Sequence, residues 1–271
     1  MNKWWFAIRG KVPLIPTVIL GIVPIVILVG IWWFLTAGPV EERRIAPSIL
    51  PSPSEVFSLE ASIQRLVVDR HLLHHTRISL QRIALGFALA LGLVVPTGIF
   101  MGAFGSVRAL LAPLATAGGC IPIATLVPLT MSWFGTDETQ KIVFLAMAFG
   151  IYLLPMVVKA IDAVPDVYLR TAATLGANVW QIVFRVLLPI SLPDIWHGMR
   201  LAFGVGWTYL VLTEVVVVNG GLGDLIFVSQ RRGPREHVYL VILVITLIAW
   251  VSDLVWVYLG RLLFGDRRAT R

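Results

Sequence analysis

Charged residues are scarce in this 271-residue sequence, where Asp, Glu, Lys and Arg together make up 14% of the chain. Ordinary soluble domains carry about 25%. Hydrophobic residues reach 58% and the mean hydropathy is +0.86, which excludes a conventional soluble domain and indicates a membrane protein. Long stretches that alternate apolar and polar residues are also missing, so we expect an all-α membrane protein and not a transmembrane barrel.

Several chemical motifs are missing as well. Cys120 is the single cysteine, which excludes a disulfide framework and a cysteine metal cluster. The chain has no H-E-x-x-H, no G-x-S-x-G and no G-x-x-x-x-G-K-[ST] sequence, so it lacks a zinc-protease helix, a hydrolase nucleophile turn and a loop that cradles ATP phosphates. We therefore expect no enzymatic activity, no metal site and no cofactor bound by this chain. The net charge of +7 comes from scattered basic residues, which suit membrane lipid headgroups and not nucleic acid.

Long apolar runs are what the sequence does contain. Six of them approach or exceed the roughly 20 residues needed to cross a bilayer, near residues 14–36, 83–104, 109–134, 141–161, 201–218 and 238–264. The first run follows Lys3, Arg9 and Lys11 as a secretory signal would. Its apolar core is too long for a signal and no A-x-A site follows, so we interpret it as a retained anchor.

The basic residues around the first span predict the orientation. The cations before it outweigh Arg43 and Arg44 just after it, which places the N-terminus inside the cell. Six spans then return the C-terminus to the same side.

Glycines and prolines predict how two of the spans pack. Gly98 and Gly102 stand at the spacing of small residues that lets two helix backbones approach closely in lipid. The third span is expected to be kinked and to border a cavity, because it contains Pro113, Pro122 and Pro128.

The segment between the first two spans opens with prolines and predicts a helix after Ser52 or Ser54. Its apolar residues fall on one stripe at helical spacing; they are Val56, Leu59, Ile63, Leu66 and Val67. We expect this helix to lie flat on the outer membrane interface.

The connection between the fourth and fifth spans, about 162–194, predicts two short helices. The first starts at Pro165 with Asp166 as its N-cap and ends at Gly176, and its stripe is Tyr168, Ala172 and Leu175. Asn178 and Gln181 form an N-x-x-Q capping box that starts the second. Its apolar stripe, Val179, Ile182, Val183 and Val186, is expected to stop at Pro189. The result is an elbow with a face of small residues, namely Ala172, Ala173, Gly176 and Ala177.

The spacing A-x-x-x-G-x(9)-V-x-L-P, formed by Ala172, Gly176, Val186, Leu188 and Pro189, resembles the EAA loop of binding-protein-dependent inner-membrane permeases, the membrane subunits of type I ABC importers. Four further stretches resemble the branch that imports nitrate, sulfonates, taurine and bicarbonate: LPSPSEVF (50–57), SLQRIALGF (79–87), IPIATLVPLTMSWFGTDETQKI (121–142) and GLGDLI (221–226). The likeness spans about residues 49–263.

The resemblance implies a type I importer permease (MetI-like) fold with six transmembrane helices and a cytoplasmic coupling loop at 163–195. It divides the chain into an anchor and outer-face segment, 1–76, and a core permease domain, 77–266. It implies a multi-pass protein of the bacterial inner membrane, with both termini cytoplasmic, that imports a small anion such as a sulfonate, taurine, nitrate or bicarbonate.

The resemblance also implies the partners and their contact site. The chain would pair with a second copy of itself, with two cytoplasmic ABC ATPases that bind ATP and magnesium, and with an external solute-binding protein. The ATPase would contact Leu169, Arg170, Ala172, Ala173, Leu175, Gly176 and Ala177. Where the family has a glutamate and its first alanine, this chain has Arg170 and Thr171.

Polar residues inside the spans are candidates for a solute path. Trp207, Thr213 and Glu214 can share one face of the fifth span, and Pro122 and Thr125 lie in the interrupted third span. A buried packing role for Glu214 is an equal alternative, since an ionised carboxylate repels an anionic solute.

Three further groups have local interpretations. His71, His74 and His75 stand at a spacing that could hold a metal, but no carboxylate or cysteine joins them and solvation at the interface is favoured. Asp253 has Arg261 two helical turns later, and we expect this pair to tether the chain near the inner interface. Trp4, Trp5, Trp32, Trp33 and Trp196 are expected to be interfacial anchors. A transporter or channel that works without an ATPase is the alternative function.

Overall fold

The computed structural model describes residues 13–39, 43–47, 49–217 and 219–265, and every regular element among them is a helix. The long helices are α1 (Leu14–Thr36), α3 (Leu72–Ala103), α6 (Glu138–Asp162), α9 (Leu188–Val216) and α11 (Glu236–Phe264). Between them lie α2 (Pro53–Val56), η1 (Leu59–Asp69), α4 (Gly105–Cys120), η2 (Ile123–Thr125), α5 (Leu126–Phe134), α7 (Asp166–Thr174), α8 (Val179–Ile182), η3 (Val183–Leu187) and α10 (Leu222–Arg232). The all-α prediction is confirmed. Trp4 and Trp5 lie outside the described residues.

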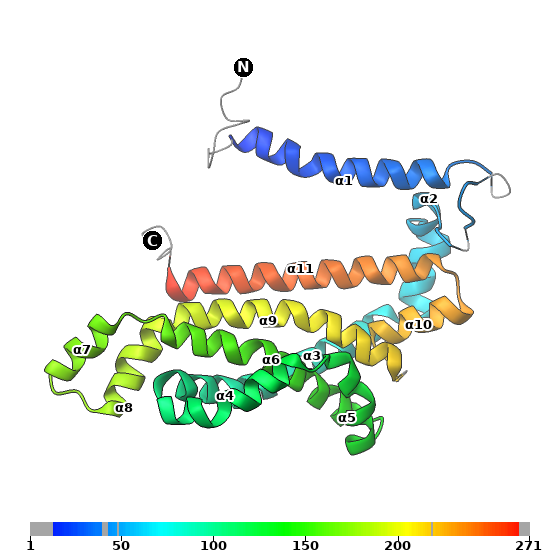
Figure 1. The fold of residues 1–271 in the computed structure, drawn as a ribbon. Coiled ribbons are helices and arrows are strands. Elements are labelled where there is room, and N and C mark those ends of the chain that lie inside the picture. The colour runs from blue at the N-terminus through cyan, green and yellow to red at the C-terminus, as the bar shows by residue number, and fades with distance from the viewer. Residues whose placement is uncertain (1–12, 40–42, 48, 218, 266–271) are drawn as a thin grey trace.

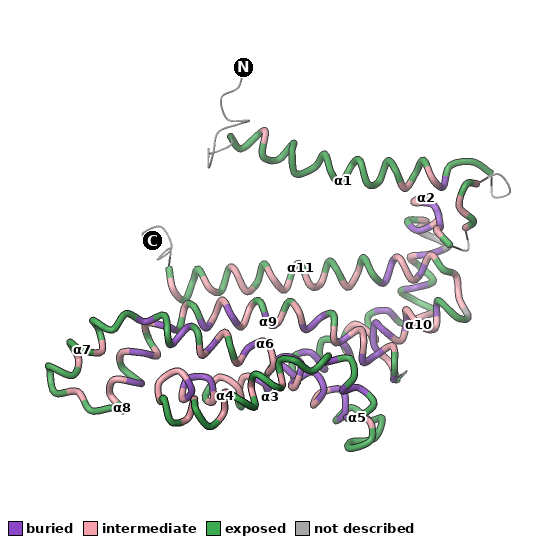
Figure 2. The backbone as a smooth tube through the Cα atoms, in the orientation of Figure 1, coloured by how far each residue is buried: buried purple, intermediate pink, exposed green. Residues whose placement is uncertain are grey.

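Among the described residues, five helical stretches are long and apolar enough to cross a membrane, and one bent pair of helices could supply a sixth. Figure 1 shows α3, α6, α9 and α11 running alongside one another, while α1 stands apart from them. The most apolar 18-residue window of α1 has 0% of its residues buried, and Figure 2 shows most residues of α1 as exposed. We infer that lipid or another chain covers α1, because a bare apolar helix is unstable in water.

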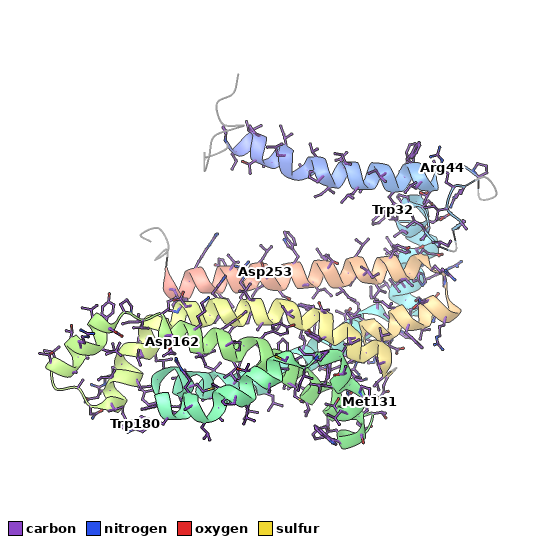
Figure 3. All side chains as sticks on the ribbon, viewed as in Figure 1. Trp32, Arg44, Met131, Asp162, Trp180 and Asp253 are labelled. Carbon is purple, nitrogen blue, oxygen red and sulfur yellow. The ribbon has the colours of Figure 1, made fainter. Side chains whose placement is uncertain are left out.

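α1 is attached to the bundle at one end, through Trp32. The indole Nε1 of Trp32 donates a hydrogen bond of 2.9 Å to the carbonyl of Pro51, and its ring stacks on Tyr239 of α11 with centroids 6.5 Å apart. Figure 3 shows Trp32 directed from α1 toward the α2 region. Trp33, its neighbour, is exposed. The two residues expected to be anchors therefore differ, since only Trp32 packs on other elements.

α3 and α6 form the central packing pair, and glycines on α3 make it possible. A Cβ at Gly98 would lie 2.7 Å from a methyl of Val157, and one at Gly102 would lie 2.5 Å from Cβ of Ile161. Both distances are too short for a carbon–carbon contact, so the predicted packing face is confirmed. α3 begins at Leu72 rather than near residue 83, because the helix continues through polar residues that the apolar run does not include.

The third predicted span is broken and not merely kinked. α4 and the η2–α5 pair meet at an angle of 86°, and Pro122 at the break has extended backbone, with φ −62° and ψ 112°. Proline has no N–H to donate and disfavours helical backbone in the residue before it. Pro113, by contrast, lies inside α4 without ending it.

The prediction that Pro189 ends the second elbow helix is wrong. Helical backbone continues from α8 through the π-helix η3 into α9, so Val179–Val216 forms one 38-residue stretch. Pro189 lies in the first turn of α9, directly after η3. Proline is tolerated in that position because the wider π-helical turn changes the backbone register just before it.

The segment between α1 and α3 forms two helical pieces, α2 and η1. Ser52 caps α2 in a capping box with Glu55, whose carboxylate accepts the Ser52 N–H at 2.8 Å. Val56 and Leu66 are buried against α10 and α11, as the apolar stripe predicts. Val67 is exposed. The stripe was predicted from α-helical spacing, whereas η1 is a π-helix with more residues per turn. Figure 1 shows α2 and η1 crossing the end of the bundle and not running along it.

Candidate functional site

The elbow between α6 and α9 is built from two short helices whose ends are closed by local hydrogen bonds. Gly176 has φ +81°, its N–H donates to Ala173, and the N–H of Ala177 donates to Ala172, both at 3.0 Å. This pair of bonds is a Schellman motif, which ends α7 where Gly176 was expected to end it. Asn178 and Gln181 then exchange side-chain-to-backbone bonds of 2.9 Å in the predicted capping box. The predicted N-cap at Asp166 is wrong, since Pro165 occupies that position and Asp166 begins α7.

The outer surface of the elbow is exposed. α7 has no buried residue, Leu175 is 82% exposed, and Arg170 is 83% exposed with its Nη2 4.0 Å from Asp166. An ion pair this long and this exposed contributes little, so Arg170 presents a charge to the surroundings. Arg170, Ala173, Leu175 and Gly176 are exposed, whereas Leu169, Ala172 and Ala177 are half-buried.

The inner surface of the elbow is attached to the long helices. Val183 and Leu187 of η3 are buried in a cluster with Ile99 of α3 and Leu153 of α6, and Leu169 packs on the same cluster. The ring of Trp180 contacts Phe104 edge to face, with centroids 5.8 Å apart. Figure 3 shows Trp180 at the base of α8 beside α4. A force on the elbow therefore reaches α3, α6 and α9 through packed side chains.

At the opposite end of the bundle, buried Arg82 of α3 organises a charged cluster that the sequence did not predict. Its Nε and Nη2 donate to Glu138 at 2.7 and 2.5 Å, and its Nη1 donates to Glu214 at 2.9 Å. Nη2 also donates to the Asn219 carbonyl at 2.8 Å, and Nη1 to the Gly220 carbonyl at 2.6 Å. All five guanidinium N–H groups thus have an acceptor. We call Arg82, Glu138, Glu214 and Ser79 the charged hub.

Glu214 lies at the centre of the charged hub and is fully buried. Besides Arg82, it accepts Ser79 Oγ at 2.7 Å and the backbone N–H of Gly223 at 2.9 Å. Gly223 lies in the first turn of α10, where backbone N–H groups favour a negative charge. A Cβ at Gly221 would lie 2.3 Å from the Glu214 carboxyl carbon. The glycines of GLGDLI therefore make room for this carboxylate.

Other polar side chains near the charged hub also contact the turn between α9 and α10. The Gly221 N–H donates to His75 Nδ1 at 3.0 Å, so His75 holds the turn before α10. His71 and His74 are exposed, and among the described residues no group of three histidine, cysteine or acidic side chains is arranged to hold a metal. Lys141 is buried with its Nζ 3.5 Å from the Asn219 carbonyl. These groups close the turn between α9 and α10.

The five residues expected to line a solute path do not share one surface. Trp207, Thr213 and Glu214 are buried inside α9 packing, whereas Pro122 and Thr125 are exposed at the break between α4 and α5. Sequence spacing along one helix placed the first three on a common face, but that face is directed into this chain.

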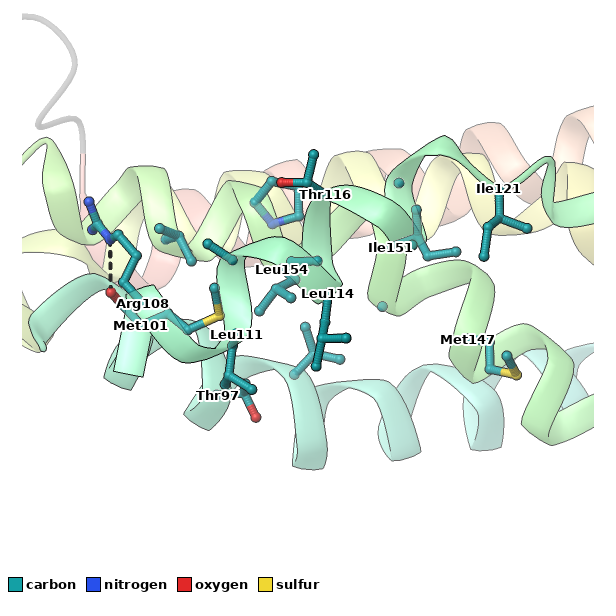
Figure 4. Close-up of a pocket in the computed structure, with 18 of the residues that line it drawn as sticks. Thr97, Met101, Arg108, Leu111, Leu114, Thr116, Ile121, Met147, Ile151 and Leu154 are labelled. Carbon is teal, nitrogen blue, oxygen red and sulfur yellow. Dashed lines mark hydrogen bonds between the residues drawn. The ribbon is translucent and has the colours of Figure 1, made fainter. Parts of the chain in front are cut away.

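A large apolar cavity lies elsewhere, between α3, α4, α5 and α6. Its volume is about 940 Å³, and Arg108, Lys159 and Asp162 line it toward the elbow end. Figure 4 shows Arg108 at one end of the cavity, with its Nε donating to the Met101 carbonyl at 3.1 Å, and mostly apolar side chains along the rest, together with Thr97 and Thr116. Arg108 also pairs with Asp162. The charged residues that line the cavity thus lie near the elbow end, and two of them are paired with each other.

Asp253, which was expected to tether the chain near the inner interface together with Arg261, has its ion-pair partner on another helix. Asp253 of α11 accepts two hydrogen bonds from Arg200 of α9, at 2.5 Å from Nε and 2.7 Å from Nη2. Arg261 is two turns along the same helix, whereas Arg200 faces Asp253 from the neighbouring helix in a forked geometry. Trp196, expected to be an anchor, packs on Trp256 with ring centroids 4.6 Å apart.

Residues 94–266 match the family described as the binding-protein-dependent transport system inner membrane component. The chain is 31% identical over 249 residues to the taurine transport system permease protein TauC of Escherichia coli (strain K12), which covers 91% of this chain and 89% of TauC. It is 27% identical over 229 residues to the putative aliphatic sulfonates transport permease protein SsuC of Bacillus subtilis (strain 168), covering 84% of this chain and 80% of SsuC. The nitrate import permease protein NrtB of Leptolyngbya laminosa is 24% identical over 225 residues, covering 82% of this chain and 79% of NrtB.

The fold resembles that of the inward-facing MetNI methionine ABC transporter, with a TM-score of 0.63 and 18% identity over 70% of this chain and 94% of that one. This likeness concerns the fold and confirms the predicted MetI-like arrangement. Together, the family match and the curated relatives show that the chain belongs to the inner membrane components of binding-protein-dependent transport systems and is a multi-pass, non-enzymatic permease subunit of an ABC importer.

Proposed function

We propose that the exposed elbow is the surface on which a cytoplasmic ATPase docks, and that the permease uses it to couple ATP hydrolysis to alternating access of its helices. The observation that carries this proposal is the double character of the elbow. Its outer surface is open, with Leu175 82% exposed, and its inner surface packs on α3, α6 and α9 through Val183 and Leu187. A partner that moves the elbow therefore moves the bundle.

The chemistry of the elbow suits close docking. Ala173 and Gly176 are exposed and small, so the ATPase backbone could approach α7 closely, while Leu175 offers one projecting apolar side chain. Leu169, Ala172 and Ala177 support these residues from the half-buried side. Arg170 adds a positive charge, which favours an acidic partner surface. ATP and magnesium would bind to the ATPase.

This docking fixes the proposed orientation. A cytoplasmic elbow places both termini in the cytoplasm of a bacterial cell and places the charged hub near the outer face. An external solute-binding protein would deliver the solute there. Two copies of the chain would pair and enclose the path, to which each contributes its apolar cavity together with Pro122 and Thr125.

The proposed solute is a small anion such as a sulfonate, taurine, nitrate or bicarbonate. Support comes from the names of TauC, SsuC and NrtB, which are permeases for taurine, aliphatic sulfonates and nitrate. Two cations, Arg108 and Lys159, line the end of the cavity nearest the elbow beside one carboxylate, Asp162, which pairs with Arg108. Glu214 is given a structural role and not a place in the path, because Arg82, Ser79 and Gly223 occupy its carboxylate.

The docking proposal is tested by replacing Gly176 with valine. Valine is strained at φ +81° and adds bulk to the docking surface, although a Cβ there meets nothing within 4 Å in the chain itself. We expect Gly176→Val to lose ATPase co-purification and solute-stimulated ATP hydrolysis in proteoliposomes. Gly135 is the matched control, since it has φ +73°, meets nothing within 4 Å and lies outside the elbow, between α5 and α6. Normal co-purification and hydrolysis in Gly176→Val would reject the proposal.

A further inference from the structure

A second cavity lies between α9 and α11, at the end of the bundle nearest the elbow. Its volume is about 340 Å³. Figure 1 shows the C-terminal end of α11, which forms one wall, on the same side of the molecule as α7 and α8. Neither the elbow nor the cavity between α3, α4, α5 and α6 contributes a side chain to it.

Rigid groups keep this second cavity open. Trp196 Nε1 donates to the Trp256 carbonyl at 3.2 Å across the two helices. Gly260 allows this contact, because a Cβ there would lie 2.8 Å from Trp196 Nε1. The two indoles thus hold the helices at a fixed separation, and the cavity is part of the packing.

The cavity carries positive charge. Arg200, Arg261 and His197 all line it. Asp253 neutralises Arg200 through Nε and Nη2, which leaves Nη1 of that guanidinium outside the pair. Arg261 is exposed, and none of the ion pairs between described residues includes it. The cavity therefore offers Nη1 of Arg200 and the guanidinium of Arg261, and guanidinium N–H groups are suited to binding a phosphate.

An apolar groove continues from the charged cavity along the same pair of helices. It has a volume of about 390 Å³, is lined by Phe203 of α9 and by α11 residues from Leu247 to Trp256, and shares Trp256 with the charged cavity. From Phe264 to Leu247 the helix rises about 25 Å, which exceeds the roughly 15 Å of hydrocarbon in one leaflet. A phospholipid fits this arrangement, because its phosphate could occupy the charged cavity while its acyl chain lies along the apolar groove.

We propose that the α9–α11 groove binds one anionic phospholipid, with its phosphate against Arg261 and Arg200 and an acyl chain along the apolar groove. The leaflet follows from the proposed orientation and is the cytoplasmic one, but the site itself does not depend on that orientation. A lipid held here would join α9, which continues from the elbow, to α11.

Native mass spectrometry of the assembled permease with its ATPase tests this proposal. The complex is given equal amounts of phosphatidylglycerol and phosphatidylcholine with identical acyl chains. We expect preferential retention of phosphatidylglycerol, and we expect Arg261→Gln to weaken it about fivefold, the effect of one arginine at a membrane surface. Arg185→Gln is the matched control, because Arg185 is exposed at the elbow end and lies outside the groove.

A second variant tests the acyl half of the site. Val251 lines the apolar groove and is exposed, so Val251→Trp should fill the groove without unfolding the chain and should weaken binding of long-chain more than short-chain phosphatidylglycerol. Equal retention of the two lipids, an equal loss in Arg185→Gln, or full displacement by excess inorganic phosphate would overturn the proposal. A protein segment found in the groove of the assembled complex would overturn it as well.

Discussion

The two ends of the helix bundle use polar residues in opposite ways. At the end that holds the charged hub, Glu214 is fully buried and every N–H of Arg82 donates to an acceptor within the chain. At the elbow end, the backbone is closed by its own Schellman motif and capping box, while Arg170 is 83% exposed. Ser79, Arg82 and Glu214 of the charged hub are buried and bonded within the chain, and its exposed member, Glu138, accepts two hydrogen bonds from Arg82. The elbow, by contrast, is locally stable and still has a free surface. This difference is why the elbow is the better candidate for docking.

Among the changes that test this difference between the two ends, removal of Arg82 is expected to cause the largest loss of stability. Arg82→Met leaves Glu214 buried without its cation, which typically costs about 3–5 kcal/mol of unfolding free energy. The double variant Arg82→Met/Glu214→Met should recover much of that loss, because it removes both charges together. Unfolding followed by circular dichroism in detergent measures both variants. A single variant within about 0.5 kcal/mol of the parent chain would show that the ion pair is not what stabilises this end.

Loss of the cap at the elbow is expected to have a smaller and more local effect. Asn178→Ala removes one half of the capping box and should cost about 1 kcal/mol. Because α8 lies at the end of the bundle, the loss should appear as faster amide hydrogen exchange in 179–182 and not as a lower global unfolding midpoint. Asn178→Asp keeps an acceptor and serves as the control. A large drop in the global midpoint for Asn178→Ala would mean that the elbow is as integral to the fold as the charged hub.

Acidification is expected to cause the smallest loss of stability, and this loss should be confined to the segment around α2. Partial burial opposes ionisation of Glu55, but hydrogen bonds from Ser52 and the neighbouring Arg43 outweigh it and lower the pKa of Glu55. The stabilisation is therefore present above the ordinary glutamate pKa of 4.5 and is lost as the pH falls through the lowered value. Hydrogen exchange in 53–56 should rise in that range in the parent chain, whereas Glu55→Gln should be less pH-dependent. Equal pH profiles for the two chains would contradict the assignment.

Features with local causes could be predicted from the sequence. The spans follow from apolar runs, and the ends of α7 and α8 follow from Gly176 and from Asn178 with Gln181, since each signal lies within a few residues of its effect. Pro189 shows the limit of such reasoning. The rule that proline ends a helix is correct for an α-helical interior, but the π-helical turn of η3 placed Pro189 in a position that tolerates it.

Pairings between distant residues could not be predicted in this way. Arg82 and Glu214 are 132 positions apart, and Arg200 and Asp253 are 53 apart, so no spacing rule connects them. A signal was nevertheless present, because a charge inside an apolar span requires a partner. Glu214 and Asp253 stand out as such charges, but spacing along one helix connects Asp253 only with Arg261 and not with Arg200 of the neighbouring helix.

The planar guanidinium of Arg82 cannot be replaced by another positively charged side chain. One planar group binds two carboxylates and two carbonyls that belong to α6, to α9 and to the turn before α10. Lysine would keep the charge, but its single ammonium has three donors at one point and cannot reach all four acceptors together. A charge-conserving substitution at residue 82 would thus lose hydrogen bonds that depend on the planar guanidinium. α6, α9 and the turn before α10 would then no longer be held by one side chain and could move separately.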